Sequence, residues 1–331
     1  MIASALTYDP LGPAVSPVFV VLTGLALYLF QRGLTRPVRL RPQVSGMQIA
    51  YFLAGVGCVV LASNAPLAPL GHSLFSAHQL EHLLLRLLGP LLIAMAHPWP
   101  VFMAALPRNW RHKIGNWANS NMARSLAYPA VATALLIAAL YVWQFPPAYA
   151  VAQRLPAVEV LAHLVMTALG LWYFAMLLDP RDPPKGHARA ARLVSGFVLI
   201  VSNIVLGSIT TLKETVVYAQ FHSRAWEGAL TAMSDETIGG YTIWVPSSMI
   251  MIVAIILVLN EWHRAEERRW STRFANRRSN SAALEFPETA HELSLKVADP
   301  NQQMGRSLAL GAVAMFFLVV MTAIFVLALT G

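Results

Sequence analysis

The chain has few charged residues and a single cysteine. Of its 331 residues, 12% are Asp, Glu, Lys or Arg, whereas 56% are hydrophobic. Because soluble domains carry about 25% charged residues, this composition predicts a polytopic membrane protein without a soluble domain. The lone Cys58 excludes a disulfide framework and a cysteine-based zinc or iron–sulfur site within one chain.

Acidic residues are also scarce, with 16 Asp and Glu against 24 Lys and Arg. A net charge of +8 suits nucleic-acid binding, but in a membrane protein it more often reflects basic cytoplasmic loops. We therefore expect the lipid bilayer as a partner, and no nucleic acid.

Eight apolar stretches approach or reach the roughly 20 residues that a helix needs to cross a bilayer. They lie at 17–30, 47–62, 76–95, 126–145, 157–178, 193–212, 238–260 and 308–329. The sequence therefore predicts an all-α, polytopic transmembrane helical bundle of about eight spans. Its expected parts are a seven-span bundle at 1–262, a charged cytoplasmic loop at 263–305 and an eighth transmembrane helix at 306–331.

The charge of the loops predicts the orientation of the bundle. Loops after the first, third, fifth and seventh spans are rich in Lys and Arg, whereas the other loops carry few. Basic loops stay in the cytoplasm, so we expect both termini to be external, in the periplasm if the cell has one.

The third span carries ionisable residues, namely His78, Glu81, His82 and Arg86. Such side chains cost several kcal/mol inside a span unless they face protein or water. At about 100° per residue the four fall within roughly 140°, so they point together into the bundle. His78 and His82 lie one turn apart on one face and can hold a metal ion. Two hydrogen-bonded packing histidines would have the same spacing.

Further candidate ligands lie at the external ends of two other spans. The fifth span brings His163 to a similar depth, about 9 Å below the surface, with Met166 on the same face. Imidazole suits copper, zinc or iron, and a thioether shifts the preference towards Cu(I). Met166 as core filler and Asp235 as a helix cap are the structural alternatives. The predicted metal ligands are His78, His82, His163, Met166, Asp235 and Glu236, with Glu81 and Met233 as alternates or outer partners.

Four phrases resemble, in the right order, those of the polytopic CtaG family, the assembly factors for caa3-type cytochrome c oxidases. The phrases are SNAPLAPLGHSLFSAHQLEHLLLRLLGPLLIAMAHP, YVWQFPPAYAVA, EVLAHLVMTALGLWYF and MSDETIGGYTIWVPSSM. The resemblance covers roughly 60–260 and matches Phe75, Ser76, His78, His82, Pro90, His163, Asp235, Gly239, Trp244 and Pro246. Glu81, Gln144 and Glu236 depart from it, standing where the family has Gln, His and Gln.

The resemblance implies a membrane assembly factor, not an enzyme, that supplies or positions copper for the CuB centre of a haem–copper oxidase. Its implied location is the bacterial inner membrane. Its implied partners are the haem–copper subunit I or the copper-bearing subunit II, and a homo-oligomer stays open. One alternative is a haem-binding membrane cytochrome with His78 or His82 and His163 as axial ligands. Another is a metal permease, with Asn203, Ser208 and Thr210 as a thin polar path.

Overall fold

The computed structural model describes residues 16–36, 43–181, 186–218, 221 and 230–275, and parts of 302–321. All secondary-structure elements in these described residues are helices. The elements are α1 (Pro17–Leu34), α2 (Gly46–Ser63), α3 (Leu67–Gly71), α4 (Phe75–Leu83), η1 (Leu84–Leu88), α5 (Gly89–Met95), α6 (Trp99–Ala105), α7 (Arg108–Ala118), α8 (Asn121–Leu126), α9 (Pro129–Gln144), α10 (Pro146–Arg154), α11 (Pro156–Leu177), α12 (Arg189–Leu212) and α13 (Ala232–Ala275).

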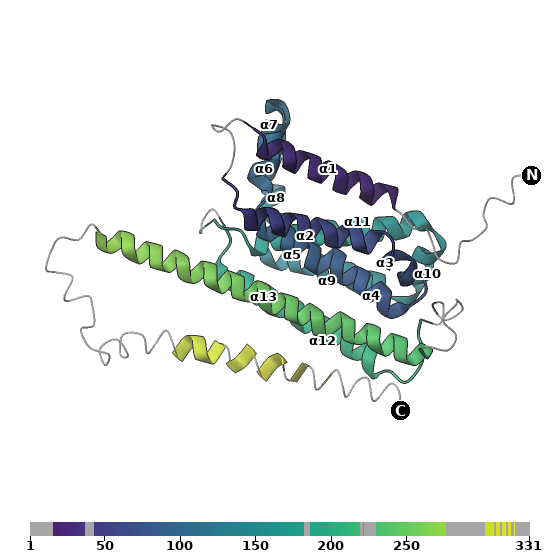
Figure 1. Ribbon diagram of the computed structural model, residues 1–331. Coiled ribbons are helices and arrows are strands. Elements are labelled where there is room, and N and C mark those ends of the chain that lie inside the picture. Colours follow the sequence, from purple (N-terminus) through teal and green to yellow (C-terminus); the bar gives the residue numbers. More distant parts are fainter. Residues whose placement is uncertain are drawn as a thin grey trace, which may run out of the picture.

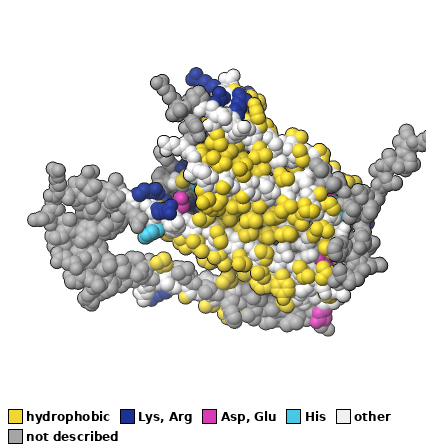
Figure 2. Space-filling view, viewed as in Figure 1, with side chains coloured by type: hydrophobic (Ala, Val, Ile, Leu, Met, Phe, Trp, Pro, Cys, Tyr) yellow, Lys and Arg dark blue, Asp and Glu magenta, His cyan; other side chains and the backbone are white. Residues whose placement is uncertain are grey.

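Five of these helices are each long and apolar enough to cross a membrane, namely α1, α2, α11, α12 and the 232–266 part of α13. Two bent pairs are long and apolar enough only together, so the described residues hold up to seven spans. One pair joins α4–α5 to α6 with a 74° bend, and the other joins α9 to α10 with a 78° bend. The predicted all-α, multi-span membrane fold is confirmed, while the predicted eighth span lies mostly outside the described residues. Figure 2 shows hydrophobic side chains across the central part of the drawn face.

The third span differs from the continuous helix that the sequence predicts. Its middle, η1, is a π-helical turn in which the Gly89 N–H donates to the carbonyl of Leu84, five residues back. Pro90 follows directly and has no N–H to return to the carbonyl of Arg86, so ordinary helical hydrogen bonding is already broken there. The turn therefore lies beside the ionisable residues of this span. Turns of this kind occur frequently at functional sites.

The helix of the seventh span is longer than predicted. Helix α13 continues through 263–275, residues that the sequence assigns to the charged loop. This segment contains no Gly or Pro and is rich in Glu, Arg and Ala, which favour helix. The division of the chain at 262 and 305 otherwise stays a prediction.

The helices pack so that α4, α11 and α13 begin at one end of the bundle, which we call the site end. Helix α13 packs along α12 and against α4, whereas α11 contacts α9, η1 and α5 (Figure 1). The Ser16 N–H donates to Asn64 Oδ1 over 2.9 Å, so α1 also begins at this end, where α2 finishes. A central apolar core that includes Tyr173, Phe174 and Met251 fixes these helices relative to one another.

Helix α2 meets α5 through a glycine, and this contact gives a test of the packing. A Cβ placed on Gly55 would lie 2.8 Å from Gly89 O and 2.7 Å from the Ile93 side chain, whereas one on Gly57 meets nothing within 4 Å. We expect Gly55→Ala to destabilise the protein by about 1–3 kcal/mol through overpacking. Gly57→Ala should be neutral or slightly stabilising, because Ala favours helix. Thermal unfolding of the two variants in detergent measures this difference, and equal effects would contradict the close approach.

Candidate metal centre

Three histidines converge near the site end. His78 and His82 come from α4, and His163 comes from α11. One ring nitrogen from each lies within 4.8 Å of the other two, and the side chains are 5%, 3% and 8% exposed. The imidazole centroids of His78 and His82 are 4.2 Å apart, and those of His82 and His163 are 5.5 Å apart. The structure therefore brings together the three histidines that the sequence placed at one depth.

These histidines border a small cavity of about 10 Å3, which is room for about one water or one ion. Its walls are His78, His82, Trp143, Tyr149, Ala152, Glu159, Ala162 and His163. Within the described residues, His82 Nδ1 and His163 Nε2 have no hydrogen-bond partner, although both atoms are buried. Buried polar atoms are rarely left unpaired, so these two nitrogens fit a ligand such as a metal ion.

Glu81 contacts one of the three histidines, His78. Its Oε2 lies 3.2 Å from His78 Nδ1, and its side chain is buried. A carboxylate on one ring nitrogen orients the imidazole and makes the other nitrogen a better metal ligand. Gly71 of α3 lies against the Glu81 carboxylate, and any larger residue there would displace it. A role for Glu81 as an outer partner of the metal site stays a prediction.

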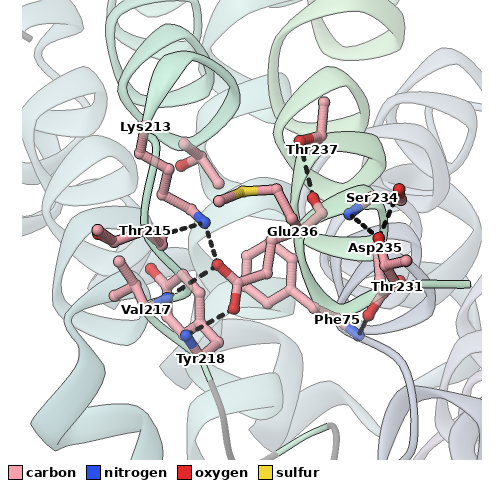
Figure 3. Close-up of polar contacts among 12 residues, drawn as sticks. Phe75, Lys213, Thr215, Val217, Tyr218, Thr231, Ser234, Asp235, Glu236 and Thr237 are labelled. Carbon is pink, nitrogen blue, oxygen red and sulfur yellow. Dashed lines mark hydrogen bonds and ion pairs between the residues drawn. The ribbon is translucent and has the colours of Figure 1, made fainter. Parts of the chain in front are cut away.

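Asp235 is placed differently from its predicted role as a metal ligand. Its carboxylate accepts the N–H of Phe75 at 2.7 Å (Figure 3). It also accepts the N–H of Ser76 at 3.1 Å and the Ser76 hydroxyl. The first N–H groups of a helix have no partner within it and attract a negative charge. Asp235 therefore ties the start of α13 to the start of α4 and does not join the three histidines.

Glu236 is likewise engaged elsewhere. It forms an ion pair with Lys213, and it accepts the N–H of Val217 at 3.0 Å and that of Tyr218 at 2.7 Å (Figure 3). This carboxylate is fully buried, so it needs these donors to offset its lost hydration. Glu236 thus fastens the 213–218 segment to α13, and it too lies outside the histidine group.

One residue of the segment that Glu236 holds, Tyr218, belongs to an aromatic cluster that packs against His78. Phe75, Tyr149, Tyr218 and Phe221 form a buried aromatic cluster, and the Tyr149 ring stands edge-on to His78 at 4.8 Å. Burial raises the pKa of Tyr218 well above its usual value, so its hydroxyl stays protonated and donates to the Gln144 carbonyl over 2.7 Å. Glu236 is therefore connected to the centre only through Tyr218 and the aromatic cluster.

The remaining predicted ligands are the methionines Met166 and Met233. Met166 is fully buried one turn beyond His163, and Met233 is half-buried in the first turn of α13. Neither is among the described residues that line the cavity. The Gln144 side chain is buried, and its amide has no hydrogen-bond partner within the described residues. A ligand role for Met166 or Met233 stays a prediction.

Five cavity residues were not predicted from the sequence, and the three that are acidic or aromatic are Trp143, Tyr149 and Glu159. Glu159 is four residues before His163, so helical periodicity places both on one face of α11, and the same argument that paired His78 with His82 would have found it. The two aromatic residues come from the bend between α9 and α10, which the sequence indicated only by its prolines.

Arg86 lies on the inner side of the centre, one turn beyond His82. It is 2% exposed, and its Nη1 donates to Asn203 Oδ1 over 3.1 Å. Since a guanidinium keeps its proton in proteins, this places a fixed positive charge between the histidines and the rest of the bundle.

The fold and this site define a multi-span helical membrane protein with a buried three-histidine centre near one end. The sequence model of the family described as cytochrome c oxidase caa3 assembly factor (Caa3_CtaG) matches residues 26–265, and the chain belongs to this family. This family assignment agrees with the resemblance found in the four motifs.

Two curated relatives are uncharacterised mycobacterial proteins. The chain is 22% identical over 237 residues to one from Mycobacterium leprae and 24% identical over 254 residues to one from Mycobacterium bovis. These alignments cover 67% and 72% of this chain but only 35% and 36% of the relatives, so the chain spans little more than a third of their length. No solved structure matches the chain.

Proposed function

We propose that this protein assists the assembly of a cytochrome c oxidase in the bacterial inner membrane by supplying or positioning copper for its CuB centre. The observation that carries the proposal is the group of three buried imidazoles, with nitrogens within 4.8 Å of one another, in a member of an oxidase assembly family. Neutral imidazole nitrogens are good copper ligands. On this proposal the protein transfers an ion and catalyses no reaction, so it is not an enzyme.

The small volume of the cavity favours one ion over the haem alternative. Two axial histidines must leave space for a flat macrocycle between them, whereas the cavity has a volume of about 10 Å3. Arg86 likewise argues against the permease alternative. A cation that moved inward from His82 would approach a buried guanidinium and be repelled by it. Both features support a site that holds copper and returns it to the side from which it came.

We propose that the site end faces the outside of the cell, with both termini on that side. The basic loops motivate this orientation, because Lys and Arg are retained in the cytoplasm. Copper would then be exchanged in the outer half of the membrane. The partner there is the haem–copper subunit I or the copper-bearing subunit II of the oxidase.

The proposal is tested in cells whose only copy of the protein carries His82→Ala. We expect normal amounts of the variant in the membrane, because backbone hydrogen bonds of the helix are unaffected and neighbouring helices still bury its apolar faces. Cytochrome c oxidase activity and CuB content should fall strongly, and added copper should restore part of both by mass action.

His112→Ala is the matched control, because it removes an exposed histidine on α7, away from the centre. It should leave oxidase activity unchanged. Normal oxidase activity and copper content with His82→Ala would refute the proposal. Loss of the variant from the membrane would assign His82 a packing role instead.

A further inference from the structure

Two further side chains with the chemistry of metal ligands, Glu159 and His72, lie beside the three histidines. Glu159 Oε1 lies 3.5 Å from Nε2 of His72, the residue that follows α3. The two side chains are 19% and 16% exposed, so they are clearly more accessible than the histidines of the centre. Glu159 also lines the cavity that His78, His82 and His163 share. The pair therefore reaches the surface on one side and the cavity on the other.

The chemistry of this pair suits a transient metal ligand. The His72 imidazole offers a ring nitrogen, which is a common ligand of metal ions. A carboxylate beside it attracts a cation and binds it less tightly than three imidazoles do. Glu159 precedes His163 by four residues, which is about 6 Å along one face of α11. An ion held at Glu159 thus needs to move by only one helical turn to reach the centre.

The other described sides of the centre are less suited to the passage of a cation. The aromatic cluster of Phe75, Tyr149, Tyr218 and Phe221 packs over His78. On the inner side, the Arg86 guanidinium repels positive charge. A cation can therefore reach the three histidines most easily past the partly exposed side chains of Glu159 and His72.

We propose that Glu159 and His72 form an outer metal-binding pair through which copper reaches His78, His82 and His163. The transfer is a ligand exchange: the ion gains imidazole nitrogens as it leaves the Glu159 carboxylate, and no electron is transferred. This proposal rests on the copper site proposed above and adds its access route. On this proposal, Glu159 and His72 determine how fast copper is loaded, and the three histidines determine how tightly it is bound.

The test follows copper transfer from a coloured Cu+ chelator to the full-length protein in detergent, under reducing conditions. The amplitude reports how much copper the centre takes, and the rate constant reports access. Wild-type protein should take one Cu+ per chain. Glu159→Gln keeps the shape of the side chain and removes its charge, so it should take the same amount about 10-fold more slowly. His72→Gln should slow loading in the same direction.

Glu214→Gln is the matched control, because Glu214 is an exposed acid that follows α12 at the site end and does not line the cavity. It should load at the wild-type rate. The access proposal fails if Glu159→Gln loads as fast as wild type, and equally if it loses the amplitude, because Glu159 would then belong to the centre itself. If wild-type protein takes no copper, the proposed function and the access route both fail. If the Glu159→Gln and His72→Gln variants take the full amount of copper at the wild-type rate, only the access route fails.

Discussion

Replacement of His163 by alanine should weaken copper binding about 100-fold or more. Even the loss of a group that only supports a ligand costs roughly 10–100-fold in metal affinity, and in the proposed copper site His163 is a direct ligand. It is also the member of the group that comes from a second helix, α11, whereas His78 and His82 share α4. Without it, two imidazoles on adjacent turns remain, with His82 Nδ1 still unpaired in the described structure. Competition with a Cu+ chelator of known affinity measures the change.

One control variant and one further test accompany this measurement. His187→Ala removes a histidine whose ring packs on Tyr128, distant from the centre, and should leave the affinity unchanged. Met166→Leu keeps the buried volume and removes only the sulfur, so an affinity loss would identify Met166 as a fourth ligand. Unchanged affinity in a variant that lacks all three histidines would show that these residues are structural.

Replacement of Glu236 by alanine should destabilise the protein by about 3–5 kcal/mol, the usual cost of leaving one member of a buried ion pair alone. The substitution leaves Lys213 without this carboxylate and removes the acceptor of the Val217 and Tyr218 N–H groups. Because Tyr218 belongs to the aromatic cluster over His78, we also expect faster copper release. Thermal unfolding in detergent and the rate of copper loss to a chelator are the measurements.

A double variant separates charge from packing. Replacing Lys213 by methionine together with Glu236 by leucine removes both buried charges, so it should lose less stability than Glu236→Leu alone. Glu214→Ala removes a nearby exposed acid and should change stability by less than about 0.5 kcal/mol. If Glu236→Ala is as stable as Glu214→Ala, then the ion pair does not hold the 213–218 segment.

The helical membrane fold and the three histidines were predictable from the sequence, and for the same reason. Apolar length defines a span, and ionisable residues within a span must face the interior. His78, His82 and His163 each lie close to the external end of a predicted span, so their depth followed from counting residues. Their meeting required only that the third and fifth spans be neighbours, which the packing of α11 on η1 and α5 provides.

The roles of the acidic residues were decided by the tertiary structure. Asp235 and Glu236 have the chemistry of metal ligands, and the sequence placed them correctly at the start of the seventh span. Their partners are backbone N–H groups of Phe75 and Tyr218, which lie 160 and 18 residues away in the chain. Main-chain donors leave no mark in a sequence, because every residue except proline carries one. The sequence by itself determined which side chains lie near one end of the predicted spans, and only the folded structure decided which of them already accept hydrogen bonds from the backbone.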